Sequence, residues 1–288
     1  MKSQKLEGVI IAMPTPLLEN EDIDIQSLHG LIDYCVDEGA NGIMLAGTMG
    51  EGPAMIDSQK YLLIEAAMEH TKGRVPILAT VPCASTRRCL KDVEVANQAK
   101  VDYIVCTSPF YYKYPDPQSL IDHLTRIAEN TDVPMIFYNA SGFTNNPVDV
   151  DTMETILNME KVRGVKDSSA NFTNFVELLR RYPDRSDRPG CIMQGDESVF
   201  DISLLMGADG VVSGGGITSI KLLLELYSAG SAGDKGRAIE CQRLFYRHLS
   251  ELLMPNPQRN WMFNIKKKLS SMGVIPNAFA TAPFMMNS

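Results

Sequence analysis

The sequence predicts an α/β protein, a (β/α)8 TIM barrel with additional C-terminal helices. Short apolar runs alternate eight times with longer stretches of helical periodicity. The apolar runs are continuous, which is typical of parallel strands that are buried on both faces. One helix-to-strand joint also recurs along the chain. The 288 residues are enough for a single barrel domain of this kind.

The expected strands and helices follow one another in a regular order. The strands cover 8–13, 42–46, 75–80, 102–106, 134–138, 162–166, 191–194 and 210–213. The helices cover about 24–38, 57–71, 85–99, 117–130, 149–159, 171–181, 197–206 and 218–229. A strand followed by a helix, repeated in this way, places helices over a parallel sheet.

The recurring joint distinguishes between two kinds of parallel sheet. Residues 38–43 (EGANGI) resemble residues 206–211 (MGADGV), and residues 98–104 (QAKVDYI) are a looser copy. In the first two copies a glycine is expected to end the helix in a left-handed cap before the next strand. Repetition of one unit favours a closed barrel, and an open doubly wound sheet remains the alternative.

We expect residues 1–230 to form the barrel and residues 231–288 to form a helical extension packed on it. Two or three further helices are predicted within 233–272, where Pro255 and Pro257 interrupt the helical pattern. No linker or charge run is long enough to mark a second globular domain.

Composition excludes several classes of function. The net charge of −8 disfavours nucleic acid as a partner, because an acidic protein repels phosphate backbones. No apolar stretch approaches the roughly 20 residues of a membrane helix, and the N-terminus lacks the apolar region of a signal peptide. The six cysteines form no CxxC pair and are expected to be reduced. We therefore expect a cytoplasmic protein without membrane association.

Lys166 is the most informative candidate for catalysis. Catalytic groups of such barrels come from the C-terminal ends of strands and from the loops that follow. Lys166 ends the sixth expected strand directly after an apolar segment. Partial desolvation of a lysine there leaves its amine free to attack a ketone. The alternative is an ammonium paired with Asp167 or Glu197, and position alone does not decide between the two.

Three hydroxyl side chains occupy comparable positions. Tyr138 ends the neighbouring strand, so its phenol could carry protons to and from a reacting group. A rim tyrosine with a satisfied hydroxyl is equally compatible with that position. Thr48 follows the second strand and Tyr111 follows the fourth, and they could extend a chain of hydroxyls to solvent.

Two glycine-rich loops also lie at strand ends. Residues 47–50 offer backbone N–H groups that could hold a carboxylate, or they form a simple tight turn. Residues 213–216 (SGGG) lie where such barrels usually bind phosphate. They could hold a phosphate, a sugar hydroxyl or nothing, and we favour the last two.

Other chemistries lack the residues that they require. The four histidines all fall in helical stretches on the expected barrel exterior, at His29, His70, His123 and His248. No cluster of His, Asp and Glu has metal-ligand spacing, so neither a metal site nor a Ser-His-Asp triad is expected. Neither GxGxxG nor GxxxxGK[ST] is found. Covalent catalysis by a lysine is the chemistry that remains.

Three motifs together resemble those of the dihydrodipicolinate synthase / N-acetylneuraminate lyase superfamily, the class I pyruvate-dependent aldolases. They are residues 47–51 (GTMGE), 138–139 (YN) and 164–169 (GVKDSS). The likeness extends from 8–16 to 264–273 and so covers nearly the whole chain. The motifs are highly specific when they occur in this order and at these spacings.

The resemblance implies an imine between pyruvate and Lys166, and therefore no separate cofactor. Tyr138 would be the proton shuttle, with Thr48 and Tyr111 in a relay. Tyr111 would reach across a subunit interface, since members of the family are usually homotetramers built from dimers.

The resemblance also implies where the substrate lies. The turn at Thr48 and Met49 would hold the pyruvate carboxylate. Gly195, Glu197 and Gly214 would line the pocket for the rest of the 2-oxo acid.

Two positions depart from the family pattern. Met49 stands where a second hydroxyl residue usually precedes Gly-Glu, so one side-chain hydrogen bond to the carboxylate is lost. Phe143 stands where the synthase branch has an arginine that clamps the carboxylate of aspartate semialdehyde. Because a buried carboxylate without a cation is costly, true dihydrodipicolinate synthase activity is not expected. Phe143 instead suggests an acceptor with an apolar or hydroxylated body.

The branches of the superfamily lead to alternative activities. Residues 108–112 (SPFYY) and 83–86 (CAST) are lyase-like, whereas Ser141 replaces the proline of the lyases. The leading hypothesis is a Schiff-base-forming lyase or aldolase of pyruvate-derived 2-oxo acids, similar to N-acetylneuraminate lyase or a 2-keto-3-deoxy sugar acid aldolase. A dehydratase or hydratase-aldolase is an alternative, because hydratase-aldolases also have a bulky apolar residue at the position of Met49, in place of the second hydroxyl residue. A non-catalytic 2-oxo acid binding protein is the alternative outside enzymes.

Overall fold

A closed barrel of parallel strands forms the centre of the computed structural model, which describes residues 6–253 and 261–283. Each strand pairs with its neighbours along the chain, and the last strand pairs with the first. The strands are β1 (Gly8–Ala12), β2 (Gly42–Leu45), β3 (Ile77–Thr80), β4 (Tyr103–Thr107), β5 (Met135–Asn139), β6 (Val162–Asp167), β7 (Cys191–Gln194) and β8 (Gly210–Ser213). The predicted barrel is confirmed, and the open sheet is excluded because β1 pairs with β8.

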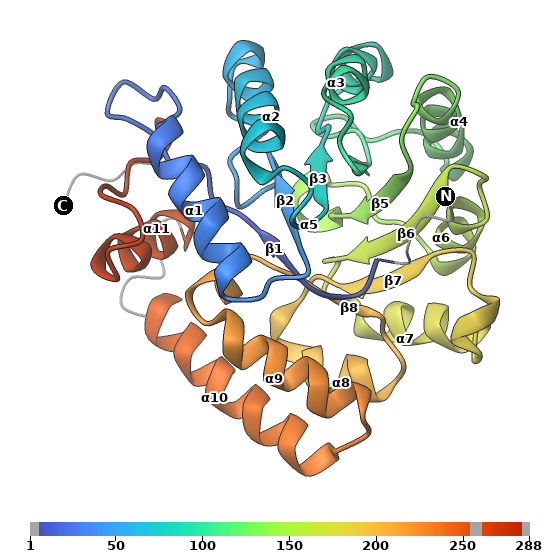
Figure 1. Ribbon diagram of the computed structural model, residues 1–288. Helices are drawn as coiled ribbons and strands as arrows, with labels where there is room; N and C mark the ends of the chain where they lie inside the picture. The colour runs from blue at the N-terminus through green and yellow to red at the C-terminus, as the bar shows by residue number, and fades with distance from the viewer. Residues whose placement is uncertain (1–5, 254–260, 284–288) are drawn as a thin grey trace.

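Helices surround the strands on the outside of the barrel (Figure 1). The main helices are α1 (Ile25–Asp37), α2 (Asp57–Thr71), α3 (Thr86–Ala99), α4 (Pro117–Ala128), α6 (Val150–Leu157), α7 (Phe172–Arg181), α8 (Phe200–Leu205) and α9 (Ile220–Ser231). Several begin at a side chain that accepts a hydrogen bond from the backbone N–H three residues later. Asp24, Asp116, Asp149 and Asn171 do so, which satisfies one free donor of each helix.

The structure adds short elements that the periodicity did not predict. A one-turn helix, α5 (Ser141–Thr144), follows β5, and three 3-10 turns are η1 (Arg185–Asp187), η2 (Glu197–Val199) and η3 (Gly215–Thr218). The single helix expected at 197–206 is divided into η2 and α8. Elements of three or four residues are too short to show a helical period.

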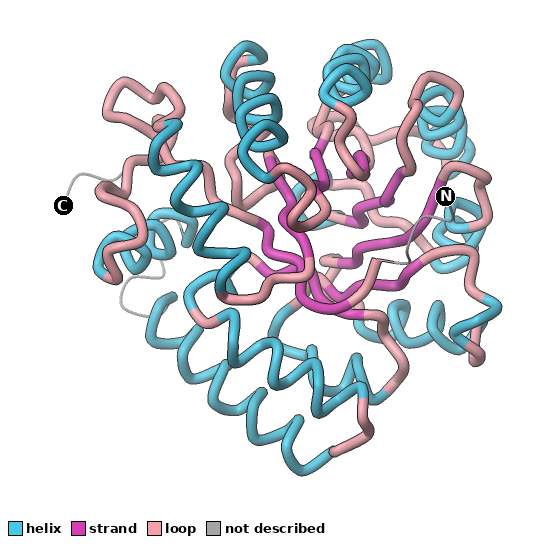
Figure 2. Tube along the Cα trace, in the orientation of Figure 1, coloured by secondary structure: helices cyan, strands magenta, loops and turns pink. Residues whose placement is uncertain are grey.

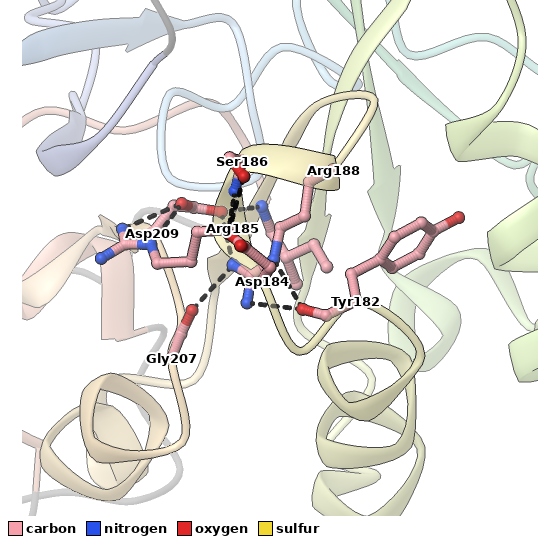
Figure 3. A network of polar contacts seen from close by, with 8 residues as sticks. Tyr182, Asp184, Arg185, Ser186, Arg188, Gly207 and Asp209 are labelled. Carbon is pink, nitrogen blue, oxygen red and sulfur yellow. Dashed lines mark hydrogen bonds and ion pairs between the residues drawn. The ribbon is translucent and has the colours of Figure 1, made fainter.

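A network around Asp209 fastens the N-terminal end of the barrel between β7 and β8 (Figure 3). The Asp209 carboxylate is fully buried and accepts from Arg188 at 3.0 Å and from Arg185 at 2.9 Å. It also accepts from the backbone N–H of Ile192 in β7. Arg188 donates to the carbonyl of Gly207 as well. Groups at this end of such a barrel contribute to stability rather than to chemistry.

Two further helices follow the barrel. The helix α10 (Lys235–Leu253) packs along α8 and α9, and α11 (Trp261–Ser271) packs on α10 and on η3. Figure 2 shows α10 running alongside α9. The expected boundary near residue 230 falls at the end of α9, and the division into two parts stays a prediction. Pro255 and Pro257 lie outside the described residues.

A buried ion pair connects α11 to the loop after β2. The side chains of Glu51 and Lys266 are both almost fully buried and form this pair. The other carboxylate oxygen of Glu51 accepts from the backbone N–H of Thr281 at 2.7 Å, and Lys266 donates to the carbonyl of Phe279 at 2.7 Å. Burial lowers the pKa of Lys266, against the opposing effect of Glu51.

The sequence also predicts reduced cysteines and no membrane helix. All six cysteines are free and buried, as expected for structural thiols. Within 6–253 and 261–283, no helix is both long and apolar enough to cross a bilayer.

Candidate active site

Lys166 and Tyr138 lie side by side at the C-terminal ends of β6 and β5. They are register partners in this parallel pair, so both side chains point to the same face of the sheet. The Lys166 Nζ atom lies 3.9 Å from the centroid of the Tyr138 ring and 3.8 Å from Sδ of Met44. Both residues are buried. The amine is therefore held in a largely apolar setting against a phenol ring.

The two carboxylates considered as partners of Lys166 are engaged elsewhere. Asp167 accepts from the backbone and hydroxyl of Ser169 and from the Asn139 amide at 2.9 Å. Glu197 accepts from the Ser213 hydroxyl at 2.6 Å. Across the described part of the chain, no carboxylate forms an ion pair with Lys166.

Opposing effects act on the phenol of Tyr138. Burial by itself raises its pKa, but the neighbouring charge of Lys166 and interactions with the hydroxyls of Thr48 and Ser168 outweigh burial. The pKa of Tyr138 is therefore lowered from its ordinary value. A phenol of lowered pKa exchanges its proton more readily near neutral pH.

A cavity of about 470 Å³ opens beside this pair. Eight of the residues predicted for the site line it together, although they come from five different strand ends. They are Thr48, Met49, Tyr138, Phe143, Lys166, Gly195, Glu197 and Gly214. The structure thus brings together the residues that the sequence assigned to a single pocket.

Tyr111 is the predicted site residue that does not join them. Its side chain is 78% exposed, and its ring packs edge-on against Tyr112 with the centroids 4.8 Å apart. Tyr111 lines neither this cavity nor the one next to it. Its backbone φ of +78° is uncommon for a bulky residue and marks a strained turn.

A neighbouring cavity, also about 470 Å³, shares several of its lining residues with the first. Thr48, Tyr138 and Phe143 line both cavities. The wall of the second cavity is largely apolar and includes Phe110 and Met262. Thr48 and Tyr138 therefore border both cavities.

The glycine-rich loop after β8 binds a group of the protein itself. The Glu197 carboxylate accepts from the backbone N–H of Gly215 at 2.8 Å and from the Ser213 hydroxyl. Burial raises the pKa of Glu197, and these hydrogen bonds offset that rise only in part. The loop that could have held a phosphate is thus occupied by a side-chain carboxylate.

Gly195 requires its lack of a side chain. A Cβ atom at this position would lie 2.0 Å from the Ser168 hydroxyl and 2.7 Å from the carbonyl of Asp167. Its N–H donates to that carbonyl at 2.7 Å. The glycine therefore lets β7 approach the end of β6 closely, next to Lys166.

Sequence reasoning missed one wall of the cavity. Tyr246 and Leu249 of α10 and Trp261 and Ile265 of α11 line it as well. Their helical spacing predicts helices beyond the barrel. No pattern in the sequence indicates that those helices pack against the C-terminal ends of the strands. The stretch between residues 6 and 253 and that between 261 and 283 contain no group of His, Cys, Asp and Glu that could hold a metal ion.

The whole sequence can now be compared with known proteins. The profile of the Dihydrodipicolinate synthetase family matches residues 5–288. The chain belongs to this family. The 4-hydroxy-tetrahydrodipicolinate synthase of Nitrosomonas europaea is 32% identical over 93% of this chain and 89% of its own. That of Methanothermobacter thermautotrophicus is 28% identical over 97% of both chains.

Solved structures resemble this family member over nearly their whole length. Dihydrodipicolinate synthase from Bacteroides thetaiotaomicron superposes with a TM-score of 0.91 at 25% identity, covering 98% of this chain and 94% of that one. CdNal from Clostridium difficile, solved with mannosamine, superposes with a TM-score of 0.89 at 19% identity, covering 98% and 94%. At 19% identity, the likeness to CdNal shows a shared fold.

Membership of the dihydrodipicolinate synthetase family establishes the class of chemistry. The chain is a carbon–carbon lyase of the class I aldolase type. Enzymes of this type bind their substrate as a Schiff base and use no separate cofactor. The relatives act on small molecules such as pyruvate.

Proposed function

We propose that this protein is an aldolase or lyase that binds pyruvate as an imine on Lys166 and adds it to, or releases it from, an uncharged acceptor. The observation that carries the proposal is the setting of Lys166. Its Nζ lies against the ring of Tyr138 in a cavity and has no carboxylate partner in the described chain. An amine in such a setting is suited to attack a ketone.

The first half of the proposed reaction uses the residues around that amine. The amine attacks the 2-oxo carbon of pyruvate, Tyr138 passes a proton to the departing oxygen, and water leaves as the imine forms. The Tyr138 phenolate then takes a proton from the methyl group, which gives an enamine and restores the phenol. The turn at Thr48 and Met49 binds the pyruvate carboxylate, which orients the ketone toward Lys166.

We also propose that Tyr111 completes the proton relay from a second subunit. Its exposed side chain lies outside the cavities of its own chain. The apolar cavity beside Thr48 and Tyr138 has room for an aromatic ring supplied by a partner. This arrangement requires at least a dimer, and we propose the homotetramer built from two such dimers.

The acceptor is proposed to lack a carboxylate. Phe143 lines the cavity where a synthase would present an arginine. Within the described lining, Lys166 is the single lysine or arginine. A carboxylated acceptor would be buried there without a cation, which is costly. Synthase activity of the kind named for the relatives is therefore not proposed.

A second candidate function uses the same imine. Met49 places a bulky apolar side chain beside the carboxylate turn, and its methyl group packs near Gly214. That feature favours a dehydratase or hydratase-aldolase, in which loss or addition of water accompanies or replaces carbon–carbon cleavage. Acceptors with hydroxyl groups, as in an N-acetylneuraminate lyase or a sugar acid aldolase, are the other form of an uncharged acceptor.

Borohydride reduction in the presence of pyruvate tests the imine. Intact mass should show one pyruvate-derived adduct per chain in the wild type and none in Lys166→Ala. Lys166→Arg keeps a cation but cannot form the adduct, whereas Lys221→Ala removes an exposed lysine and should keep it. An adduct that survives in Lys166→Ala would contradict the proposal. Pyruvate binding without exchange of its methyl protons would indicate a non-catalytic binding protein.

A further inference from the structure

We propose that the acceptor half of the site takes an apolar aldehyde, and that an aryl aldehyde fits it best. This inference rests on the proposed function, since it concerns the partner of the Lys166 enamine. It goes beyond that function by choosing between the apolar and the hydroxylated acceptor, which the imine chemistry leaves equal. Three features of the cavity carry it.

The first feature is an apolar wall built from three elements. It consists of Phe143 of α5, Tyr246 and Leu249 of α10, and Trp261 and Ile265 of α11. Leu249 and Ile265 are buried, whereas Phe143 is 59% and Tyr246 56% exposed. The inner wall is thus aliphatic and the mouth is aromatic. An aryl ring between them would cover apolar surface that now faces solvent.

The second feature is the sign of the charges around that wall. Asp196 and Glu197 line the cavity, and among its described lining residues Lys166 is the one cation. Lys166 loses its accessible amine when the imine forms. The loop after β8 already binds the Glu197 carboxylate. Among the described lining residues, a phosphate or carboxylate on the acceptor would therefore find no cation other than Lys166, and the backbone N–H of Gly215 is already taken by Glu197.

The third feature is that the two acidic side chains of this half-site are engaged by the protein itself. Asp196 accepts from the backbone N–H and the hydroxyl of Ser198 at 3.0 and 2.6 Å. Glu197 is held by Ser213 and Gly215. The other short hydroxyl side chains of this half-site are Ser168, Ser198 and Ser250, and a polyhydroxylated chain would need a partner for every hydroxyl that it buries against Leu249. An apolar body makes no such demand.

The bond-forming step balances without any further reactant except water. The enamine carbon, which was the methyl carbon of pyruvate, attacks the aldehyde carbon and forms a carbon–carbon bond. The carbonyl electron pair moves to the aldehyde oxygen, which takes a proton from Tyr138. Water then hydrolyses the imine, releasing a 4-hydroxy-2-oxo acid and restoring the Lys166 amine. Cleavage is the same sequence in reverse.

The test compares three aldehydes of similar size with purified full-length enzyme and pyruvate. Benzaldehyde is the aryl probe, succinic semialdehyde the carboxylated probe and erythrose the hydroxylated probe. We expect kcat/KM for benzaldehyde to exceed each of the others by about tenfold or more, the scale expected for burying a few apolar carbons. Preference for erythrose or for succinic semialdehyde would overturn the inference.

Variants separate this inference from the function on which it rests. Phe143→Arg should lower the ratio of kcat/KM for benzaldehyde to kcat/KM for succinic semialdehyde by about tenfold or more, because it supplies the missing cation. Ile239→Arg places the same charge on an exposed position of α10 outside the cavity and should leave the ratio unchanged. A wild type without a pyruvate adduct would refute the proposed function itself. An adduct together with no turnover of benzaldehyde would refute only the apolar acceptor.

Discussion

At Tyr138 the balance between burial and neighbouring groups decides how the phenol behaves. Burial disfavours the phenolate, while Lys166 and the Thr48 hydroxyl favour it, and the second set prevails. The sequence predicted that these three residues lie at strand ends, because strand ends are visible in the apolar runs. The resulting pKa depends on the contacts between side chains, which the sequence does not contain.

Thr48→Val should raise the pKa of Tyr138, since it removes one of the interactions that lower it. The measurement is a titration followed by the ultraviolet absorbance of tyrosinate, with the Tyr138→Phe variant subtracted to isolate this residue among ten tyrosines. Thr125→Val, in α4 and away from the site, is the matched control and should leave the titration unchanged. An unaltered or lower pKa in Thr48→Val would show that Thr48 does not act on the phenol.

Glu197→Gln should change how stability depends on pH. Because burial raises the pKa of Glu197 above its unfolded value, the wild type is stabilised as pH falls through the folded pKa. This contribution is complete below the unfolded value of about 4.3 and is lost as pH rises through the folded pKa. Glutamine does not titrate. The thermal midpoint of the wild type minus that of the variant should therefore increase from pH 7 toward about pH 4.5, and a decrease would contradict the assignment.

At the scale of elements, the barrel was predictable and the shape of the acceptor wall was not. Eight apolar runs with helices between them are a strong repeated signal. The short α5 carries Phe143 into the cavity but has too few residues for a period. The helices α10 and α11 show helical spacing, yet their return to the strand ends depends on tertiary contacts such as the pair of Glu51 with Lys266.

Lys266→Met should destabilise the protein by about 3–5 kcal/mol, because it leaves Glu51 buried without its cation. Urea unfolding monitored by circular dichroism would measure the loss. Adding Glu51→Gln to Lys266→Met should recover part of that stability, since no buried charge then remains. Lys267→Met, at the exposed neighbouring position of α11, should have little effect. If Lys266→Met loses no more stability than Lys267→Met, the ion pair contributes nothing to the free energy of unfolding.

Asp209→Asn should also destabilise the barrel by about 3–5 kcal/mol, since Arg188 is buried against this carboxylate. The substitution lies at the end of the barrel opposite Lys166, so pyruvate trapping by the folded variant should be unchanged. Asp132→Asn is a control at an exposed position. Loss of trapping in a variant that remains folded would contradict the separation of the stabilising end from the reactive end.

For the whole molecule, the role proposed for Tyr111 would make activity depend on assembly. If Tyr111 serves the site of a partner, then in a mixed dimer of Tyr111→Phe with Lys166→Ala both substitutions impair the same site. A mixed dimer of the two variants then contains one site with an intact lysine and an intact partner tyrosine. Co-expression with two affinity tags should give mixed dimers with up to about half of the wild-type activity. Mixed dimers no more active than either parent would show that Tyr111 does not complete the site of a partner.

The contact between Glu51 and Thr281 has a consequence for the synthesis of the chain. The two residues are 230 positions apart in the sequence, so nearly the whole protein must leave the ribosome before this carboxylate finds its partners. Until then Glu51 is a charge in a loop whose final place is buried, next to the turn that begins at Gly47. The turn proposed to hold pyruvate is therefore expected to reach its final form late, when α11 docks, and a nascent barrel would carry Lys166 before it carries a finished site.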